Sequence, residues 1–403
     1  MVNLWDNVKW LTLAPRATLI AKVDSIAAGP SALAQVLLGS PQNITRLESG
    51  TIKGKHYQAV VIADNQVSAM DWSTIGIPVA VVGESLNHLS HQDIIRIEPV
   101  TNRVRVLFKR AFRHNSLLIT ERCNNYCVMC SQPPREIDDS WIADELFRVV
   151  ELIPKDTVEV GITGGEPTLL GEKLLQLIKF IKNQLPSTSL HILSNGRKFS
   201  DLEFAQKCAA IGHPDLMFGI PLYGDNYIDH DFVVQAKGGF NEAVRGIVNL
   251  KRNRIKVEIR CVIHRDTCQR LSHLATFITR NLTFVDHVAL MGYEAMGFGK
   301  SNVRQLFVLP DVFMEELNAA IQILRAARIN TSVYNLPLCL LNGEAASLSV
   351  QSISDWKNEY LPDCDGCNDK HRCTGFFTST KELYRGHVRP NKTSATMLAP
   401  LNA

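Results

Sequence analysis

Residues 118–131 read LITERCNNYCVMCS, and this stretch decides how the rest of the chain is interpreted. An apolar strand-like run ends near Thr120, and three cysteines follow in the next loop at the spacing C-x3-C-x2-C: Cys123, Cys127 and Cys130. Iron–sulfur clusters take cysteine thiolates as ligands, so three thiolates from one loop can hold three irons of a cubane. The fourth iron is then open to a small molecule. A structural zinc site needs four closed ligands, and no fourth cysteine or histidine lies nearby.

The region from 113 to 300 alternates strand-like runs with amphipathic helical patterns, which indicates a parallel sheet of the α/β class. Asp139 or Ser140 can cap the first helix. Six repeats predict an open, partial (β/α)6 barrel, in which chemistry collects at the carboxyl ends of the strands. The expected strands are Ser116–Thr120, Val158–Ile162, Leu190–Ser194, Leu216–Leu222, Lys256–Ile263 and Phe284–Met291.

The cysteine loop and the pattern that follows it resemble the radical S-adenosylmethionine (radical SAM) enzymes. The resemblance implies that Cys123, Cys127 and Cys130 hold a catalytic [4Fe–4S] cluster whose open iron chelates the amino and carboxyl groups of SAM. Electron transfer from the cluster would then release a 5′-deoxyadenosyl radical that takes hydrogen from the substrate. Met129 stands where the family usually carries an aromatic residue, and it would lie near the adenine.

A glycine pair and a carboxylate follow the second expected strand. Gly164 and Gly165 allow a close backbone approach to a ligand, and the carboxylate of Glu166 can accept hydrogen bonds from an ammonium group. With Pro167, these residues resemble the family motif that binds the SAM amino group. An ordinary strand–helix turn is the alternative.

Further candidates for binding SAM follow the later strands. Ser194 and Asn195 can bind ribose hydroxyls or the carboxylate, although Asn-Gly also suits a plain turn. Arg260 can pair with the SAM carboxylate. Met291 ends the sixth strand, where the family often contacts the adenine. Tyr223 and His230 are weaker candidates and would face the substrate.

A second group of cysteines has the spacing C-x24-C-x2-C-x5-C: Cys339, Cys364, Cys367 and Cys373. Four thiolates can close a metal site, and zinc ribbons also use C-x2-C, so the spacing leaves the metal open. The group resembles the shortened C-terminal cluster domain of radical SAM peptide maturases, which implies one auxiliary [4Fe–4S] cluster. Its role would be electron transfer with the substrate radical, or that of a structural clasp.

Three segments resemble the HxsC family, the radical SAM maturases of His-Xaa-Ser systems: residues 120–134, 221–231 and 334–377. This resemblance implies post-translational modification of a small precursor peptide with His-Xaa-Ser repeats, together with a second radical SAM maturase. It also implies a reducing donor such as flavodoxin or ferredoxin. The alternatives are a radical SAM enzyme acting on a small molecule or on RNA, and a non-catalytic iron–sulfur electron carrier or redox sensor.

The flanking regions carry less information. Residues 1–112 contain strand-like runs and a possible short helix at Ser31–Leu38, which predicts a small α+β domain with either a docking role or a plain structural role. Residues 301–403 begin with a helical pattern at Asp311–Ala327, continue through the cysteine-rich region, and end in a tail from Gly386 without periodicity.

The overall composition is that of an ordinary folded protein. Of the 403 residues 45% are hydrophobic and 21% charged, and the net charge is +3, which predicts neither nucleic acid nor a membrane surface as a partner. The first residues lack the features of a signal peptide, and no stretch approaches the ~18 apolar residues of a membrane helix. We therefore expect a cytoplasmic location.

Overall fold

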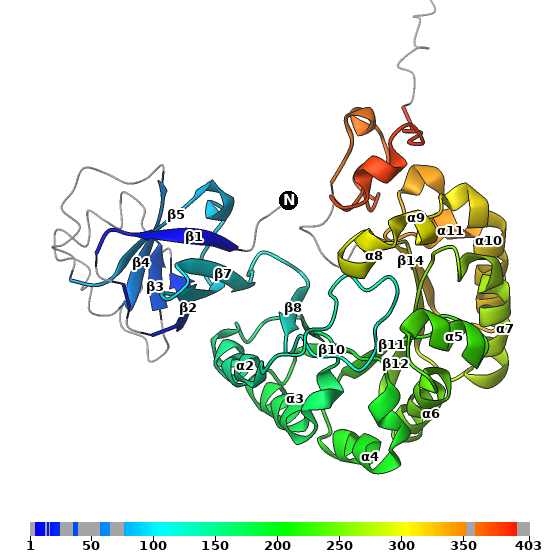
Figure 1. The fold of residues 1–403 in the computed structure, drawn as a ribbon, viewed down its shortest axis with the longest axis horizontal. Coiled ribbons are helices and arrows are strands. Elements are labelled where there is room, and N and C mark those ends of the chain that lie inside the picture. Colours follow the sequence, from blue (N-terminus) through cyan, green and yellow to red (C-terminus); the bar gives the residue numbers. More distant parts are fainter. Residues whose placement is uncertain are drawn as a thin grey trace, which may run out of the picture. The chain divides into compact units, whose positions relative to one another are not determined.

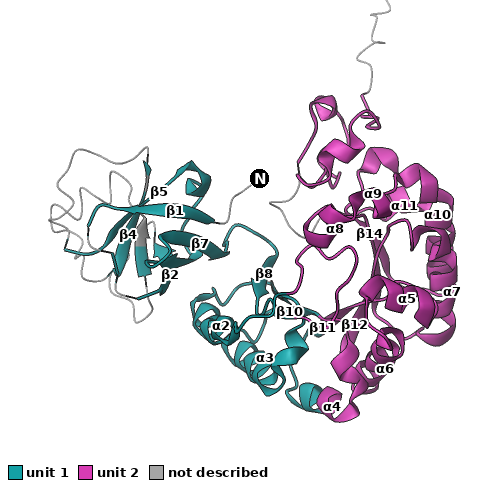
Figure 2. Ribbon diagram, viewed as in Figure 1, with its two compact units in different colours: residues 1–122, 135–193, 207–216 teal, residues 123–134, 194–206, 217–403 magenta. Residues whose placement is uncertain are grey.

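The computed structural model describes residues 5–12, 14, 15, 17–24, 35–38, 57–64, 76–351 and 359–392. The chain divides into two compact units, which Figure 2 colours separately. Unit 1 comprises residues 1–122, 135–193 and 207–216, and unit 2 comprises residues 123–134, 194–206 and 217–403.

Unit 1 begins with a closed β-barrel (blue to cyan in Figure 1), whose strand order among the described residues is β1-β5-β4-β3-β2-β6-β7. Strand β1 closes the barrel because it pairs antiparallel with both β5 and β7. Small and branched side chains such as Val23, Val36 and Val61 are fully buried in its core. The strands are β1 (Trp5–Trp10), β2 (Leu19–Asp24), β3 (Gln35–Leu38), β4 (Ala59–Ala63), β5 (Val79–Val82), β6 (Ile94–Glu98) and β7 (Arg103–Phe108).

The described part of residues 1–112 shows strands and short 3-10 turns such as η4 (Glu84–Leu86), but no α-helix. The α+β class of the whole region stays a prediction, because residues 25–34, 39–56 and 65–75 lie outside the described ranges. The helix expected at Ser31–Leu38 is wrong over Gln35–Leu38, which form β3, and its first four residues lie outside the described ranges. Parallel pairing of β3 with β2 on one side and β4 on the other overrides the helical pattern of the local sequence.

The second sheet follows the chain order from β8 to β14. Parallel pairing joins β8 to β9 and β9 to β10 in unit 1, and joins β11 to β12, β12 to β13 and β13 to β14 in unit 2. The sheet is open because β8 and β14 stand at the two ends of the order. The strands are β8 (Asn115–Leu118), β9 (Glu159–Thr163), β10 (Ser189–Leu193), β11 (Leu216–Pro221), β12 (Lys256–Val262), β13 (His287–Met291) and β14 (Thr331–Tyr334).

The strand β14 corrects the expected count of six. All six expected strands are present, each within a few residues of the predicted bounds, and β14 adds a seventh beyond residue 300. Its four residues pair in parallel with Val288–Met291 of β13. The open parallel α/β sheet is therefore confirmed, whereas the predicted number of six strands is wrong because the sheet has seven among the described residues.

Helices separate the strands and bury one apolar face each. In α3, for example, Leu174, Leu177, Ile178 and Ile181 are almost completely buried. No helix among the described residues is both long and apolar enough to cross a membrane. The helices that follow the strands are α2 (Ser140–Leu152), α3 (Glu172–Gln184), α4 (Leu202–Ala210), α5 (Tyr227–Val234), α6 (Gly239–Arg252), α7 (Leu271–Asn281), α8 (Gly297–Ser301) and α9 (Val303–Leu306).

The C-terminal part of unit 2 begins with α10 (Pro310–Ala326), which confirms the expected helix, and also contains α11 (Gly343–Ser347). Beyond α11 the described residues form 3-10 turns and loops around a small apolar core that includes Leu361, Phe376 and Tyr384. Glu359 and Phe376 form an antiparallel bridge that brackets the last three cysteines. The end of the expected loose tail, residues 393–403, lies outside the described ranges.

Candidate functional site

The three cysteines of the first group lie on one loop of unit 2, close to the end of helix α5. The N–H of Tyr126 donates to the carbonyl of Val234 at 3.1 Å, and the N–H of Val128 donates to that of Val233 at 2.9 Å. Cys127 lies between these two anchors, and the N–H of Cys130 donates back to the carbonyl of Cys127 at 2.9 Å. Backbone hydrogen bonds therefore determine how the loop presents its thiols.

The thiols of this loop are close enough to influence one another. Burial, together with the negative charge of Cys130 and Cys123 thiolates, raises the pKa of Cys127 to about 12. Burial also raises the pKa of Cys130. Three thiolates so placed repel one another unless a cation lies among them, and metal ions reverse such shifts. The donor set fits the iron–sulfur cluster that the spacing predicts.

In unit 1 the strand end that leads into this loop is held by Asp139. The side chain of Asp139 is 1% exposed, and its carboxylate accepts hydrogen bonds from the hydroxyl of Thr120 and the N–H of Glu121. Asp139 is the N-cap of α2, as expected, but its side chain makes no capping bond to that helix. Sequence reasoning identified the position and missed its role.

The Gly-Gly-Glu-Pro turn packs against the same strand end. The N–H of Gly165 donates to the carbonyl of Thr120 and the N–H of Glu166 to that of Arg122, each at 2.8 Å. A Cβ at Gly164 would lie 2.4 Å from the Thr120 carbonyl oxygen, so only glycine fits there. Arg122 directly precedes Cys123, and the turn therefore supports the entrance of the cysteine loop.

The carboxylate of Glu166 is completely buried and already has partners within its own turn. It accepts hydrogen bonds from the N–H of Thr168 at 2.9 Å and from the Thr168 hydroxyl at 2.6 Å, and so caps the 3-10 turn η5 (Pro167–Leu170). Binding of the SAM amino group by Glu166 stays a prediction.

In unit 2, Ser194 and Asn195 form a turn that contacts the cysteine loop directly. Gly196 has a φ of 78°, and its N–H donates to the Ser194 hydroxyl at 3.1 Å. The Nδ2 of Asn195 donates to the Oδ1 of Asn124 at 2.6 Å, and its Oδ1 accepts from the N–H of Arg197 at 3.0 Å. The expected Asn-Gly turn is present, and its asparagine is also bonded to the loop. Binding of SAM by Ser194 and Asn195 stays a prediction.

Arg260 and Met291 lie together on neighbouring strands of unit 2. The guanidinium of Arg260 forms an ion pair with Glu258, and its Nη2 lies 3.2 Å from the Sδ of Met291. Tyr223 packs against the same apolar cluster as Cys127. Burial and then the thiolate of Cys127 raise the pKa of Tyr223 well above the usual value, while the charge of Arg260 lowers it. His230 stacks on Tyr223 with ring centroids 5.8 Å apart. The structure brings these candidates near the loop, and their roles stay predictions.

Met129 is 6% exposed and belongs to an apolar cluster with Val233, Tyr293, Ala295 and Leu306. The segment after β13 holds this part of the loop: the N–H of Phe298 donates to the carbonyl of Cys130, and the Nδ2 of Asn302 to that of Val128, both at 2.8 Å. These residues carry no motif, so sequence reasoning missed them.

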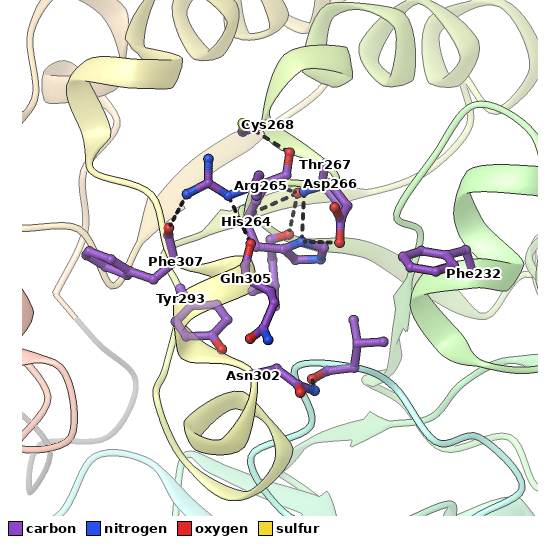
Figure 3. A network of polar contacts seen from close by, with 12 residues as sticks. Phe232, His264, Arg265, Asp266, Thr267, Cys268, Tyr293, Asn302, Gln305 and Phe307 are labelled. Carbon is purple, nitrogen blue, oxygen red and sulfur yellow. Dashed lines mark hydrogen bonds and ion pairs between the residues drawn. The ribbon is translucent and has the colours of Figure 1, made fainter.

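Figure 3 shows a network of polar contacts in unit 2 that is centred on His264, in the loop that follows β12. His264 is fully buried, and burial lowers its pKa to about 4. Its Nδ1 accepts the N–H of Asp266 at 3.3 Å, while its Nε2 has no hydrogen-bond partner among the described residues. The imidazole is therefore neutral, with its proton on Nε2.

The four cysteines of the second group line one cavity of about 60 Å³, together with Tyr360 and Phe376. Among the described residues, no three His, Cys, Asp or Glu side chains meet closely enough to hold a single metal ion. Burial raises the pKa of Cys339, and the other three cysteines raise it further. The Sγ of Cys373 accepts the N–H groups of Leu338 at 3.3 Å and Gly375 at 3.4 Å. The structure thus brings Cys339, Cys364, Cys367 and Cys373 together around a common space.

Known proteins match the middle of the chain. Residues 117–278 match the model of the radical SAM superfamily. The curated GTP 3′,8-cyclase of Petrotoga mobilis is 25% identical over 197 residues, and the match covers 47% of this chain and 58% of that protein. Among solved structures, Streptococcus suis SuiB bound to S-adenosylmethionine is 17% identical to this chain with a TM-score of 0.45, and the match covers 57% of this chain and 51% of SuiB. A radical SAM methyltransferase from Sphaerobacter thermophilus is 14% identical with a TM-score of 0.42, and the match covers 60% of this chain and 72% of the methyltransferase. By the family-model match, residues 117–278 correspond to a radical SAM domain.

Proposed function

We propose that the chain is a radical SAM enzyme whose reaction begins at Cys123, Cys127 and Cys130. The observation that carries this proposal is the cysteine loop itself, which lies in the segment that matches the radical SAM model and is held by the backbone hydrogen bonds of Tyr126, Val128 and Cys130. When bound there, a [4Fe–4S] cluster would supply the electron that cleaves SAM reductively to the 5′-deoxyadenosyl radical, which abstracts hydrogen from the substrate.

The remaining candidates would bind and orient SAM. The backbone of Gly164, Gly165 and Pro167 and the carboxylate of Glu166 would receive the amino group. Arg260 would pair with the carboxylate, and Ser194 and Asn195 would bind polar groups of the cofactor. Met129 and Met291 would pack against the adenine. An ionic and apolar set of this kind fits a cofactor with a charged methionine end and a flat base.

The test is release of 5′-deoxyadenosine by anaerobically purified protein given SAM and dithionite. We expect release by the wild type and none by Cys127→Ala. Cys208→Ala is the matched control, because Cys208 is buried on α4 outside both cysteine groups, and it should retain release. Failure of the iron-loaded wild type to release the nucleoside would favour the electron-carrier alternative. Unchanged release by Cys127→Ala would contradict the proposed site.

We further propose that Cys339, Cys364, Cys367 and Cys373 hold an auxiliary [4Fe–4S] cluster. The support is that the four cysteines line one cavity, and that their spacing resembles the C-terminal cluster domain of radical SAM peptide maturases. Backbone N–H groups directed at the Cys373 sulfur stabilise a thiolate and shift the potential of such clusters. This cluster would exchange an electron with the substrate radical.

For the substrate, we propose a small ribosomally made precursor peptide of the His-Xaa-Ser type. The support is the resemblance of residues 120–134, 221–231 and 334–377 to the His-Xaa-Ser maturases. The second group of four cysteines also resembles the shortened C-terminal cluster domain of radical SAM peptide maturases. A second radical SAM maturase and a flavodoxin or ferredoxin would be the protein partners. The reduced clusters would suit the cytoplasm. Mass spectrometry of the co-expressed peptide, with and without this protein, tests the proposal, with isomerisation checked by chromatography; an unmodified peptide would contradict it.

A small-molecule substrate is the second candidate. Its support is the curated GTP 3′,8-cyclase, which this chain matches over 58% of the length of that enzyme. Incubating the reduced enzyme with SAM and either GTP or the peptide separates the two candidates: the true substrate should increase the release of 5′-deoxyadenosine and become modified. The net charge of +3 gives no support to RNA.

A further inference from the structure

Arg197 contacts the cysteine loop at two points within unit 2. Its Nη1 donates to the backbone carbonyl of Asn124 at 2.8 Å and to the Oδ1 of Asn125 at 2.9 Å. Its Nε pairs with the carboxylate of Glu242 on α6. A guanidinium presents its donors in a rigid plane, so one side chain can bridge a helix and a loop in a defined geometry.

The backbone that carries Arg197 is itself firmly placed. Gly196 adopts a left-handed conformation with φ 78°, and α6 approaches so closely that a Cβ at Gly246 would lie 2.2 Å from the Gly196 carbonyl oxygen. The Nδ2 of Asn249, also on α6, donates to the carbonyl of Phe199 at 2.9 Å. The 3-10 turn that starts at Arg197 is therefore seated on α6, and the guanidinium extends from a fixed base.

The contacted residues lie between the first two cysteines. Only Asn124, Asn125 and Tyr126 separate Cys123 from Cys127. Arg197 binds two of them, and Asn195 binds the side chain of Asn124 as well. Asn125 is 4% exposed, and its N–H donates to the Sγ of Cys123 at 3.4 Å. The separation and direction of the first two thiols therefore depend on groups that Arg197 holds.

We propose that Arg197 is the positioning residue of the cysteine loop, holding Cys123 and Cys127 in the arrangement that binds and retains the cluster. This inference rests on the proposed function, because it assumes a cluster at those cysteines. The carboxylate of Glu242 also holds the Arg197 guanidinium through an ion pair. Because the Glu242 side chain is 42% exposed, this ion pair stabilises the loop less than the contacts of Arg197 with Asn124 and Asn125 do. Loss of the guanidinium should therefore speed cluster loss more than loss of the Glu242 charge.

The experiment compares Arg197→Ala, Arg197→Lys and Glu242→Gln with the wild type in the full-length, anaerobically purified protein. Three quantities are measured: cluster loss in the presence of a chelator, the SAM-dependent change in the EPR spectrum of the reduced protein, and amide exchange over residues 123–130. Arg245→Ala is the matched control, because Arg245 is an exposed arginine one turn from Glu242.

We expect Arg197→Ala to lose the SAM-responsive cluster about tenfold faster than the wild type, as the loss of charge-assisted hydrogen bonds predicts. Amides of the loop should exchange faster, while the auxiliary cluster and the thermal midpoint stay close to those of the wild type. Cluster loss in Arg197→Lys should be intermediate in rate, in Glu242→Gln slightly faster than in the wild type, and in Arg245→Ala the same as in the wild type. A double-mutant cycle of Arg197→Ala with Asn125→Ala should be non-additive, because both remove the same contact.

Equal rates of cluster loss in Arg197→Ala and Arg245→Ala would overturn the inference. So would parallel loss of both clusters with a lowered thermal midpoint in Arg197→Ala and Arg197→Lys, since that pattern indicates a general structural role. If the wild type assembles no cluster at Cys123, Cys127 and Cys130, the proposed function fails. Amide exchange over the loop would still show whether Arg197 holds it.

Discussion

The carboxylate of Asp139 accepts a hydrogen bond from the hydroxyl of Thr120 at 2.9 Å across 19 residues of sequence. Both side chains are almost fully buried, and the same carboxylate accepts the N–H of Glu121. The strand end before the cysteine loop is thus fixed by a residue at the start of the next helix.

Replacing Asp139 by alanine should destabilise this strand end. Two buried donors would lose their acceptor, which costs about 1–3 kcal/mol of unfolding free energy. We expect a lower thermal midpoint and less iron at the first site, measured by calorimetry and iron analysis. Asp144→Asn is the control, because its side chain is 67% exposed. Identical midpoints for the two variants would show that the bonds of Asp139 contribute nothing.

Gly164→Ala should be more damaging than Gly238→Ala. A Cβ at Gly164 meets the Thr120 carbonyl oxygen at 2.4 Å, and the backbone must shift to accept it. Gly238 has a left-handed backbone with φ 79° and ψ 1° and open space around it, so alanine there costs only about 1 kcal/mol of backbone strain. For Gly164→Ala we expect chemical denaturation to show a loss of about 2–3 kcal/mol of unfolding free energy, with loss of first-site iron. A smaller effect at Gly164 than at Gly238 would refute the packing argument.

His264 should make stability depend on pH. Burial lowers its folded-state pKa to about 4, below the unfolded value of about 6.5. Between these values the unfolded chain binds more protons, so unfolding free energy falls as the pH drops from 6.5 towards 4. The stability is fully present above pH 6.5. His264→Gln should flatten this part of the curve of thermal midpoint against pH, whereas exposed His273→Gln should not. Parallel curves for all three proteins would contradict the assignment.

Cys364→Ala and Cys373→Ala should remove about four of about eight irons per chain, the content of two cubanes. SAM cleavage should persist in both variants, because the first cluster is unaffected, while the peptide product should be lost. Cys268→Ala, which changes a buried cysteine outside both groups, is the control. Loss of one zinc without loss of iron would identify the second site as a zinc site instead.

Local sequence patterns predicted much of the open sheet. Leu216–Leu222 became β11, which ends one residue earlier, and Lys256–Ile263 became β12, which also ends one residue earlier. Their apolar runs are long and bounded by turn residues, so the pattern is readable without the fold. Strand β14 has only four residues, half of them polar, and it becomes a strand by pairing with β13. Likewise, β3 has a helical pattern that its neighbours in the barrel override.

The candidate site likewise combines features that local sequence predicts with features that only the fold decides. The spacing of Cys123, Cys127 and Cys130 and the Gly-Gly-Glu-Pro turn are local features, because each lies within one short segment, and both can be read from the sequence alone. Which side chains hold that loop was decided by the tertiary structure: Arg197 lies 73 residues from Asn124, and Asn302 lies 174 residues from Val128. A hydrogen bond between such distant residues exists only after the sheet has formed, because the sheet brings their strand ends together.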